Sequence, residues 1–253
     1  MRVLSNEKIA LNIYSLTFES TSELLESLPG QFVNINVRGE DSPFFRRPFS
    51  IASATDDCIE IIFEVVGAGT WQLSTLHVGD SVDVIGPLGL GYDLDFTESK
   101  SLLIGGGVGL PPLMFLYYKM KNKGIEPQFL AGFKSVSYNF MPRNITNVNF
   151  SSDDGSLGSK GYVTDLLIET LFHEKVDHIY ACGPEPMLSK VIEIAEENEI
   201  RCSVSIEKVF GCGTGICFGC VIENSLKRLT ETGRKYSLAC VEGTVFDAGD
   251  INL

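Results

Sequence analysis

Residues 101–112 read Ser101-Leu-Leu-Ile-Gly-Gly-Gly-Val-Gly-Leu-Pro-Pro112, an apolar run followed by a glycine-rich turn and two prolines. The apolar run predicts a short buried strand. Because proline is favoured in the first turn of a helix, the residues that follow predict a helix over Leu113–Lys123 that ends at Gly124. A strand, a tight turn and a helix in this order are typical of the first unit of a parallel α/β sheet.

The alternation of strand and helix continues to about residue 206. Further strands are expected at Pro127–Gly132, Val148–Ser151, His178–Ala181 and Arg201–Ile206. Helices are expected from an N-cap at Thr164 to about Phe172, and over Glu185–Glu197. Residues 99–206 are therefore predicted to form a doubly wound parallel α/β domain.

The first 98 residues have the short period of β-strands. Alternating polar and apolar runs, separated by glycine and proline turns, predict strands at Ile9–Phe18, Gln31–Val37, Cys58–Val66 and Ser81–Ile85, with another beginning near Phe45. Several short strands at this spacing predict a small antiparallel β-barrel over residues 1–98.

The amino-acid composition argues against some classes of binding partner. Twenty Lys and Arg against 33 Asp and Glu give a net charge of -13, which argues against nucleic acid or an anionic membrane as a partner. No apolar run is long enough to span a bilayer, and the first residues lack the pattern of a secretory signal. We therefore expect a cytoplasmic protein.

Four of the seven cysteines lie near the C-terminus. Cys212, Cys217 and Cys220, followed after 19 residues by Cys240, give the C-x4-C-x2-C…C spacing of plant-type [2Fe–2S] clusters. The glycines between them let backbone N–H groups approach the sulfurs. A structural zinc site is the alternative, although zinc sites usually pair two short knuckles. Residues 207–253 otherwise show little periodicity, so we expect a small domain stapled by a [2Fe–2S] cluster.

Two segments of the α/β domain predict a nucleotide site. Gly105, Gly106, Gly107, Val108 and Gly109 form a turn between strand and helix, where a pyrophosphate can approach the backbone and the helix N-terminus. Cys182, Gly183 and Pro184 follow another strand, at the end where open α/β sheets bind ligands. The glycine turn has an alternative interpretation as a tight connection that binds no ligand. Cys182 has one as a small buried residue.

The barrel carries a weaker signal for a flavin. In Arg47-Pro48-Phe49-Ser50 an arginine can neutralise a cofactor phosphate and a hydroxyl can reach a flavin edge. Gly69-Thr70 resembles a phosphate-binding turn. An exposed basic edge strand is the alternative.

In this order the motifs resemble those of the ferredoxin–NAD(P) reductase superfamily. The C-terminal cysteines, ending in Cys240-Val-Glu-Gly-Thr-Val-Phe246, and the glycine-rich segment between Ser152 and Asp165 are most similar to the electron-transfer subunits of NAD-linked (type B) dihydroorotate dehydrogenases. The resemblance covers essentially the whole chain. Two departures are Glu64, where relatives often carry a basic residue or one flanked by aromatics, and the long Cys220–Cys240 gap, which suggests an inserted loop over Asn224–Lys235.

The resemblance implies three cofactors. FAD would be held by Arg47, Pro48, Phe49, Ser50, Ile62, Phe63, Glu64, Gly69 and Thr70, and NAD by Gly105–Gly109 and Cys182–Pro184. Cys212, Cys217, Cys220 and Cys240 would ligate the [2Fe–2S] cluster. Hydride transfer needs no acid–base residue, so no catalytic residue is expected, and the three histidines are expected to be structural.

The resemblance also implies a partner, since this chain lacks an eight-fold βα pattern. Electrons would pass from an FMN-containing TIM-barrel dihydroorotate dehydrogenase catalytic subunit, in a heterotetramer of two copies of each, through the cluster and FAD to NAD⁺. One alternative is the NAD(P)H reductase subunit of a hydrogenase, a sulfide dehydrogenase or a ferredoxin-dependent bifurcating complex. A second is a non-enzymatic redox sensor or zinc-stapled binding module.

Overall fold

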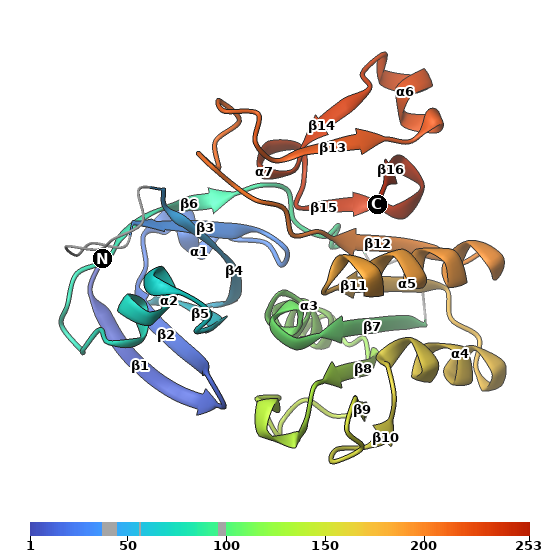
Figure 1. Cartoon of the computed structure of the whole chain (residues 1–253), viewed down its shortest axis with the longest axis horizontal. Coiled ribbons are helices and arrows are strands. Elements are labelled where there is room, and N and C mark those ends of the chain that lie inside the picture. Colours follow the sequence, from blue (N-terminus) through green and yellow to red (C-terminus); the bar gives the residue numbers. More distant parts are fainter. Residues whose placement is uncertain (37–44, 56, 96–99) are drawn as a thin grey trace.

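The computed structural model describes residues 1–36, 45–55, 57–95 and 100–253. Figure 1 shows three parts: an N-terminal β-barrel, a central α/β sheet, and a small C-terminal group of strands and helices beside one edge of that sheet. The expected domain boundary at residues 98 and 99, and the expected end of a strand at Val37, lie outside the described residues.

Six antiparallel strands form the N-terminal part. They are β1 (Val3–Ala10), β2 (Ile13–Glu19), β3 (Phe32–Asn36), β4 (Arg47–Ala54), β5 (Cys58–Glu64) and β6 (Asp83–Leu88), in the sheet order β1-β2-β5-β4-β3-β6. The sheet closes because the amide of Val3 donates to the carbonyl of Asp80 at 2.8 Å, and the amide of Val82 donates to that of Met1 at 2.9 Å. The predicted antiparallel barrel is confirmed. Two short helices, α1 (Ser22–Leu25) and α2 (Ala68–Ser74), lie in its connections.

The single strand expected over Ile9–Phe18 is wrong. The chain turns back after Leu11, so that β1 and β2 form a hairpin. Asn12 sits in the turn with φ 59°, a left-handed conformation that asparagine tolerates better than most residues. The alternation of apolar residues continues across this turn, and for that reason periodicity alone merged the two strands.

The central sheet has seven strands. They are β7 (Ser101–Gly106), β8 (Gln128–Phe133), β9 (Val148–Ser152), β10 (Ser159–Lys160), β11 (His178–Cys182), β12 (Arg201–Ser205) and β15 (Val245–Asp247), in the order β10-β9-β8-β7-β11-β12-β15. All neighbours are parallel except β15, which pairs antiparallel with β12. The doubly wound parallel sheet is confirmed.

Helices cover both faces of this sheet. On β7, Leu102 and Ile104 face a core shared with α4 (Val163–His173) and α5 (Glu185–Glu197). Leu103, between them, faces a core shared with α3 (Leu110–Asn122). Helix α3 also contacts β4 of the barrel, so it is buried between two domains and apolar on most of its surface. Within the described residues, none of the helices has the length and apolar character needed to cross a membrane.

The start of α4 differs from expectation. Thr164 is not the N-cap; it lies inside the helix and is buried. The cap residue is Tyr162, whose amide donates to the carboxylate of Asp165 at 2.9 Å. The acidic side chain three residues into the helix satisfies the free amide and thereby sets the helix start.

The C-terminal segment is more regular than expected. Strands β13 (Val221–Asn224), β14 (Tyr236–Leu238) and β16 (Ile251–Asn252) form a three-stranded sheet. The segment expected to be an inserted loop contains helix α6 (Leu226–Thr232), which begins where Ser225 Oγ accepts from the Arg228 amide and ends at Gly233 with φ 69°. The remaining elements are η1 (Gly107–Gly109), η2 (Val136–Tyr138), α7 (Ala239–Glu242) and η3 (Ala248–Asp250).

Thr244 joins all three parts. Its hydroxyl donates to the carbonyl of Gly30 in the barrel, and its own carbonyl accepts from the amide of Ile206 at 3.0 Å. The next residues enter the central sheet as β15. The C-terminal segment is thus tied both to the barrel and to the edge of the α/β sheet.

Replacing Thr244 with Val should destabilise the whole chain. The valine keeps the shape but leaves the buried carbonyl of Gly30 without its donor, which costs about 1–3 kcal/mol of unfolding free energy. The midpoint of thermal unfolding measures the effect. Thr230→Val on α6 is the control, because the hydroxyl it removes donates to Leu226 at an exposed position. Equal midpoints for both variants would contradict the joining role of Thr244.

Candidate functional site

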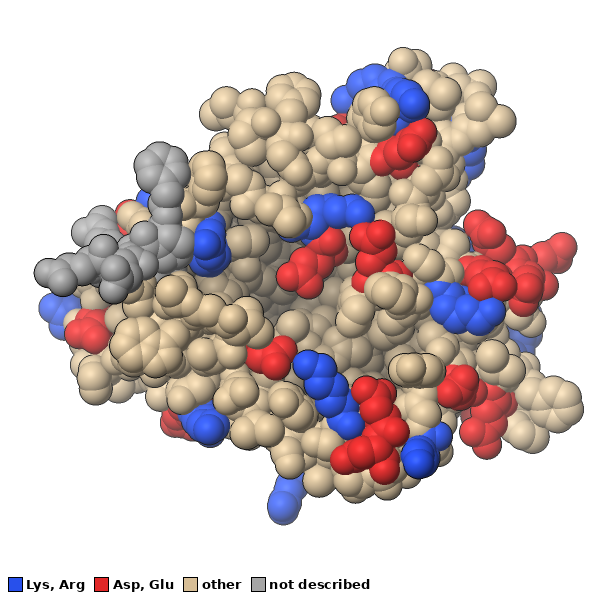
Figure 2. Space-filling model, viewed as in Figure 1, with Lys and Arg blue, Asp and Glu red and all other residues tan. Residues whose placement is uncertain are grey.

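The surface is hollowed between the barrel and the α/β part, and charged side chains of both signs line the rim of the hollow (Figure 2). Strand β7 borders this region, with β8 on one side and β11 on the other. The chain moves outward from β7 through β8 to β10 and then returns to β11. In open α/β sheets the carboxyl ends of the strands at such a reversal bind ligands.

The two predicted nucleotide-binding segments meet there. Gly105 and Cys182 are opposite each other in the paired strands β7 and β11. A Cβ on Gly109 would lie 2.5 Å from the carbonyl oxygen of Cys182, and one on Gly183 would lie 2.7 Å from the Met187 side chain. The backbones of both turns therefore touch, and side chains on these glycines would fill the space in which the turns meet. A glycine cradle at a helix N-terminus fits a dinucleotide phosphate.

Cys182 is buried at this meeting point. Burial raises the pKa of its thiol to about 12, so the thiol stays protonated at neutral pH. Tyr92 supports the same strand end, because its hydroxyl donates to the carbonyl of Ala181 at 2.9 Å. Cys182 is thus suited to packing and not to nucleophilic attack.

The predicted flavin residues of β4 lie on one strand. Arg47, Pro48, Phe49 and Ser50 are all half-buried, so they are accessible to a ligand. Among the described residues, Arg47 donates only to the carbonyls of Phe45 and Arg46, at 3.2 and 3.4 Å. Its neighbour Arg46 is instead paired with Asp83 at 2.8 Å. The charge of Arg47 therefore fits a cofactor phosphate better than that of Arg46.

The other predicted flavin residues are arranged differently. Ile62 and Phe63 are buried on opposite faces of β5, so a ligand can reach them only through their backbone. Thr70 Oγ1 accepts from the amides of Val66 and Gly67 at 3.0 and 3.2 Å, which orders the turn that leads into α2. The carboxylate of Glu64 lies 4.0 Å from the ammonium of Lys134.

The four C-terminal cysteines form two pairs. The amide of Cys212 donates to Cys217 Sγ, and the amide of Cys217 donates to Cys212 Sγ, both at 3.3 Å. The amide of Cys240 donates to Cys220 Sγ at 3.4 Å. Further N–H donors come from Thr214 to Cys212 and from Gly219 to Cys217, both at 3.4 Å. Sulfurs that accept several amides are arranged to carry negative charge.

The acidity of these thiols follows from their surroundings. Hydrogen bonds from the Thr214 and Cys217 amides lower the pKa of Cys212 to about 6. Burial, together with the neighbouring thiols of Cys220 and Cys212, raises the pKa of Cys240 to about 12. A Cβ on Gly215, between Cys212 and Cys217, would lie 2.7 Å from the Val241 side chain, so the loop of the first pair packs beside the segment that carries Cys240.

This donor set fits a binuclear iron cluster. Such a cluster needs two thiolates for each of two irons, which matches the two pairs. In the part of the chain that the structure describes, no three Cys, His, Asp or Glu side chains are grouped as ligands of one ion would be. Three closely spaced cysteines followed after 19 residues by Cys240 match the cluster spacing, whereas structural zinc sites usually draw on two short C-x2-4-C knuckles.

Asn34 is a contact that sequence reasoning missed. It is fully buried on β3, and its side-chain amide donates to the carbonyl of Cys212 at 3.0 Å. Nearby, the rings of Phe32 on β3 and Phe210 lie 5.0 Å apart. A buried asparagine among apolar residues was the available signal, but its partner is 178 positions away.

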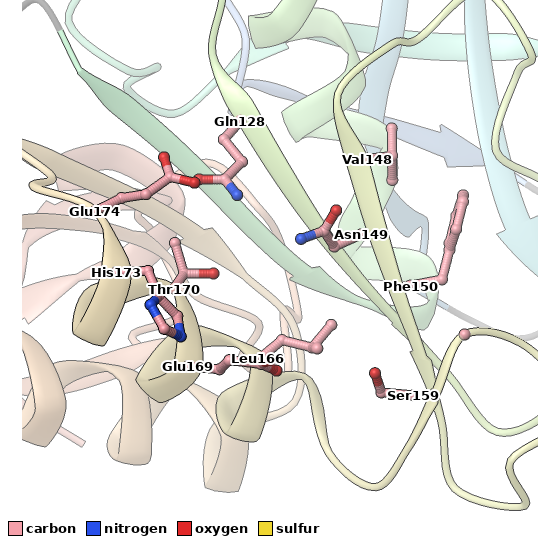
Figure 3. A pocket seen from close by; sticks show the side chains of 11 residues that line it. Gln128, Val148, Asn149, Phe150, Ser159, Leu166, Glu169, Thr170, His173 and Glu174 are labelled. Carbon is pink, nitrogen blue, oxygen red and sulfur yellow. The ribbon is translucent and has the colours of Figure 1, made fainter.

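A cavity of about 460 Å³ lies elsewhere, between α4 and the edge strands β9 and β10. Figure 3 shows His173 and Thr170 on the helix on the same side of the strand as Asn149. None of the predicted site residues lines it.

Comparisons with known proteins agree with this geometry. The chain is 36% identical to the "Dihydroorotate dehydrogenase B (NAD(+)), electron transfer subunit" of Geobacillus sp. (strain WCH70), over 100% of this chain and 98% of the relative. It is 34% identical to the protein of the same name from Caldanaerobacter subterraneus subsp. tengcongensis, over 99% of this chain and 96% of the relative. The chain belongs to the family of dihydroorotate dehydrogenase B electron transfer subunits.

Family models match each part of the chain. The iron–sulfur cluster binding domain of dihydroorotate dehydrogenase B matches residues 207–252, an oxidoreductase NAD-binding domain matches 134–193, and an oxidoreductase FAD-binding domain matches 1–92. The chain is thus a flavin- and NAD-dependent oxidoreductase with an iron–sulfur domain.

Among solved structures, a structure of NADH-dependent reduced ferredoxin–NADP oxidoreductase, studied for flavin-based electron bifurcation, matches with a TM-score of 0.87 and 28% identity. The match covers 99% of this chain and 89% of that one. A crystal structure of full-length CYP116B46 from Tepidiphilus thermophilus matches with a TM-score of 0.69 at 16% identity, over 98% of this chain and 40% of that one, which shows a shared fold.

Replacing Gly109 with Ala should weaken nucleotide binding. The new Cβ would lie 2.5 Å from the Cys182 carbonyl, so the two turns must separate. Overpacking of this kind costs about 1–3 kcal/mol. We expect NADH affinity, measured by titration of the FAD-loaded protein, to fall by about tenfold or more. Gly249→Ala is the control, because its Cβ meets only the ends of the Asp247 and Lys227 side chains. Unchanged affinity in Gly109→Ala would contradict the proposed cradle.

Alkylation of metal-free protein should separate the thiols by pKa. At pH 7 Cys212, with a pKa of about 6, is mostly thiolate, whereas Cys182 and Cys202, each with a pKa raised to about 12 by burial, are protonated. Iodoacetamide should therefore modify Cys212 first. Lowering the pH to 5 should slow this reaction by roughly tenfold, because the thiolate is lost below its pKa. Peptide mass spectrometry measures each rate; equal rates at Cys182 and Cys212 would refute the assignment.

Proposed function

We propose that this chain is the electron-transfer subunit of an NAD-linked dihydroorotate dehydrogenase. In this role it passes electrons from an FMN-containing TIM-barrel catalytic subunit, through a [2Fe–2S] cluster and FAD, to NAD⁺. Two copies of each subunit would form a heterotetramer in the cytoplasm, acting in pyrimidine biosynthesis. The full-length similarity to subunits of this name supports the proposal.

The observation that carries the proposal is the packing of the cysteine loop on β3. Asn34 and Phe32 of β3 contact Cys212 and Phe210. In the barrel, Asn34 is paired with Pro48 and Phe32 with Ser50, both on β4. The cysteine loop therefore lies one strand away from the predicted flavin segment, and this closeness favours electron exchange between a cluster and a flavin.

The residues of this chain would hold each cofactor as follows. Arg47 would neutralise an FAD phosphate, while Pro48, Phe49 and Ser50 would line the flavin edge. The backbone of Ile62, Phe63 and Glu64, and the Gly69-Thr70 turn, would complete the site. When bound, a flavin exchanges a hydride with a nicotinamide and single electrons with an iron–sulfur cluster.

The α/β and C-terminal parts would hold the other two groups. The backbone of Gly105–Gly109 would bind the nucleotide diphosphate, and Cys182, Gly183 and Pro184 would pack beside the nicotinamide. Cys212 with Cys217, and Cys220 with Cys240, would each hold one iron. The amides of Thr214 and Gly219 would stabilise negative charge on the sulfurs.

A second candidate is the reductase subunit of a ferredoxin-dependent bifurcating complex. The observation in its favour is the fold match, with a TM-score of 0.87, to the NADH-dependent reduced ferredoxin–NADP oxidoreductase. Its identity of 28% is lower than the 36% found for the dihydroorotate dehydrogenase B subunit.

Reconstitution with the FMN-containing partner tests the proposal. We expect the mixture to reduce NAD⁺ with dihydroorotate, and the purified chain to show flavin and iron–sulfur absorption. Cys240→Ser should lower this activity more than about 100-fold, because loss of a ligand removes the cluster. The NADH–ferricyanide activity of the same variant should persist, since it requires only the flavin.

Cys58→Ser is the matched control, because Cys58 lies on β5 away from the four paired cysteines. It should retain both activities. Absence of dihydroorotate-dependent NAD⁺ reduction, with activity towards reduced ferredoxin instead, would favour the second candidate. A colourless protein that contains zinc would refute both.

A further inference from the structure

An ion pair joins the barrel to the α/β domain beside the glycine turn. The carboxylate of Glu64, at the end of β5, lies 4.0 Å from the ammonium of Lys134, directly after β8. Three-quarters of the Glu64 side chain is buried, whereas Lys134 is 70% exposed. The Lys134 ammonium also lies 5.5 Å from the ring centre of Tyr138.

Lys134 follows the second strand of the α/β unit, β8. Strand β8 is the neighbour of β7, and Gly132 is paired with Gly106 at the start of the glycine turn. The turn η1 contacts both β5 and β8, the strands at whose ends Glu64 and Lys134 lie. In doubly wound folds the end of this second strand distinguishes the two nucleotides: an acidic residue binds the ribose 2′-hydroxyl of NAD, and a basic residue accommodates the 2′-phosphate of NADP.

This chain has a basic residue where an NAD-dependent protein is expected to have an acidic one. A carboxylate instead approaches from the barrel, where Glu64 lies 4.0 Å from the Lys134 ammonium. Further carboxylates lie close by, because the turn after β9 packs on the segment after β8: the Asp153 amide donates to the Phe133 carbonyl at 3.1 Å, and the Val136 amide donates to Ser156 Oγ at 2.8 Å. Asp153 and Asp154 in that turn are exposed.

We propose that Glu64 sets the nucleotide preference of this chain by neutralising Lys134. Paired with Glu64, Lys134 is withheld from a 2′-phosphate, and NAD(H) is preferred over NADP(H). The inference rests on the proposed function and deepens it by naming the determinant of nucleotide choice. Ion pairs between partly exposed side chains are weak, so the preference is graded and one substitution should shift it.

The test compares Glu64→Gln, Lys134→Gln and the double variant in the full chain with its cofactors bound. The kcat/KM values for NADH and NADPH are measured with ferricyanide as acceptor, and rates are normalised to flavin content. Glu64→Gln should raise kcat/KM for NADPH by about fivefold, because a freed ammonium can pair with the 2′-phosphate. The readout is the NADPH-to-NADH ratio of kcat/KM, because any effect of the substitution on flavin binding would alter the values for both nucleotides equally.

Lys134→Gln and the double variant show whether the rise in kcat/KM for NADPH depends on Lys134. Lys134→Gln should alter neither value by more than about twofold, and the double variant should lose the gain of Glu64→Gln. Glu193→Gln is the matched control, because it removes a carboxylate from an exposed ion pair with Lys190 on α5, and it should leave both values unchanged.

Two results would overturn the inference: an equal change for both nucleotides in Glu64→Gln, or a gain for NADPH that survives in the double variant. The assay uses no partner subunit. Failure of dihydroorotate-dependent activity and failure of nucleotide selection by Glu64 are therefore separate outcomes.

Discussion

The packing of the cysteine loop on barrel strand β3 is the contact on which the arrangement of the sites depends. Asn34 is fully buried, and its amide donates to the carbonyl of Cys212 at 3.0 Å. A buried amide that loses its partner costs about 1–3 kcal/mol, so this bond favours one register of the loop over its alternatives. The contact between the Phe32 and Phe210 rings buries apolar surface, but unlike a hydrogen bond it does little to fix the orientation of the loop. The polar bond thus supplies the geometric precision and the aromatic pair supplies the burial.

A second attachment keeps the loop in place. Strand β15 pairs with β12 at the edge of the α/β sheet, and Thr244, just before it, bonds to Gly30 of the barrel. The C-terminal segment is therefore attached to both neighbours and not to one alone. A short segment with little core of its own gains most of its order from such contacts. The cysteine pairs accordingly sit on a frame that is fixed from two sides.

Features set by residues close together in the sequence were predicted better than contacts between distant segments. Helix α5 was predicted with its observed bounds, and the iron–sulfur domain was predicted because its cysteines follow a short, characteristic spacing. The hairpin at Asn12 was missed because apolar alternation continues across it, and the α4 cap was misplaced because Asp165, not Thr164, satisfies the first amide. Asn34, β15 and the Glu64–Lys134 pair join distant segments, and no local pattern reveals such partners.

Strand β4 occupies the middle of the molecule. On one side it contacts α3, the helix that begins directly after the glycine turn η1. On the other it pairs with β3, the strand on which the cysteine loop packs. The flavin proposed to bind on β4 would therefore have the proposed nucleotide turn on one side and the cysteine loop on the other. This order matches the chemistry, because a flavin is the group that can exchange a hydride with one neighbour and single electrons with the other. With the proposed sites in these places, the fold would keep the nicotinamide and the cluster apart and put the flavin between them.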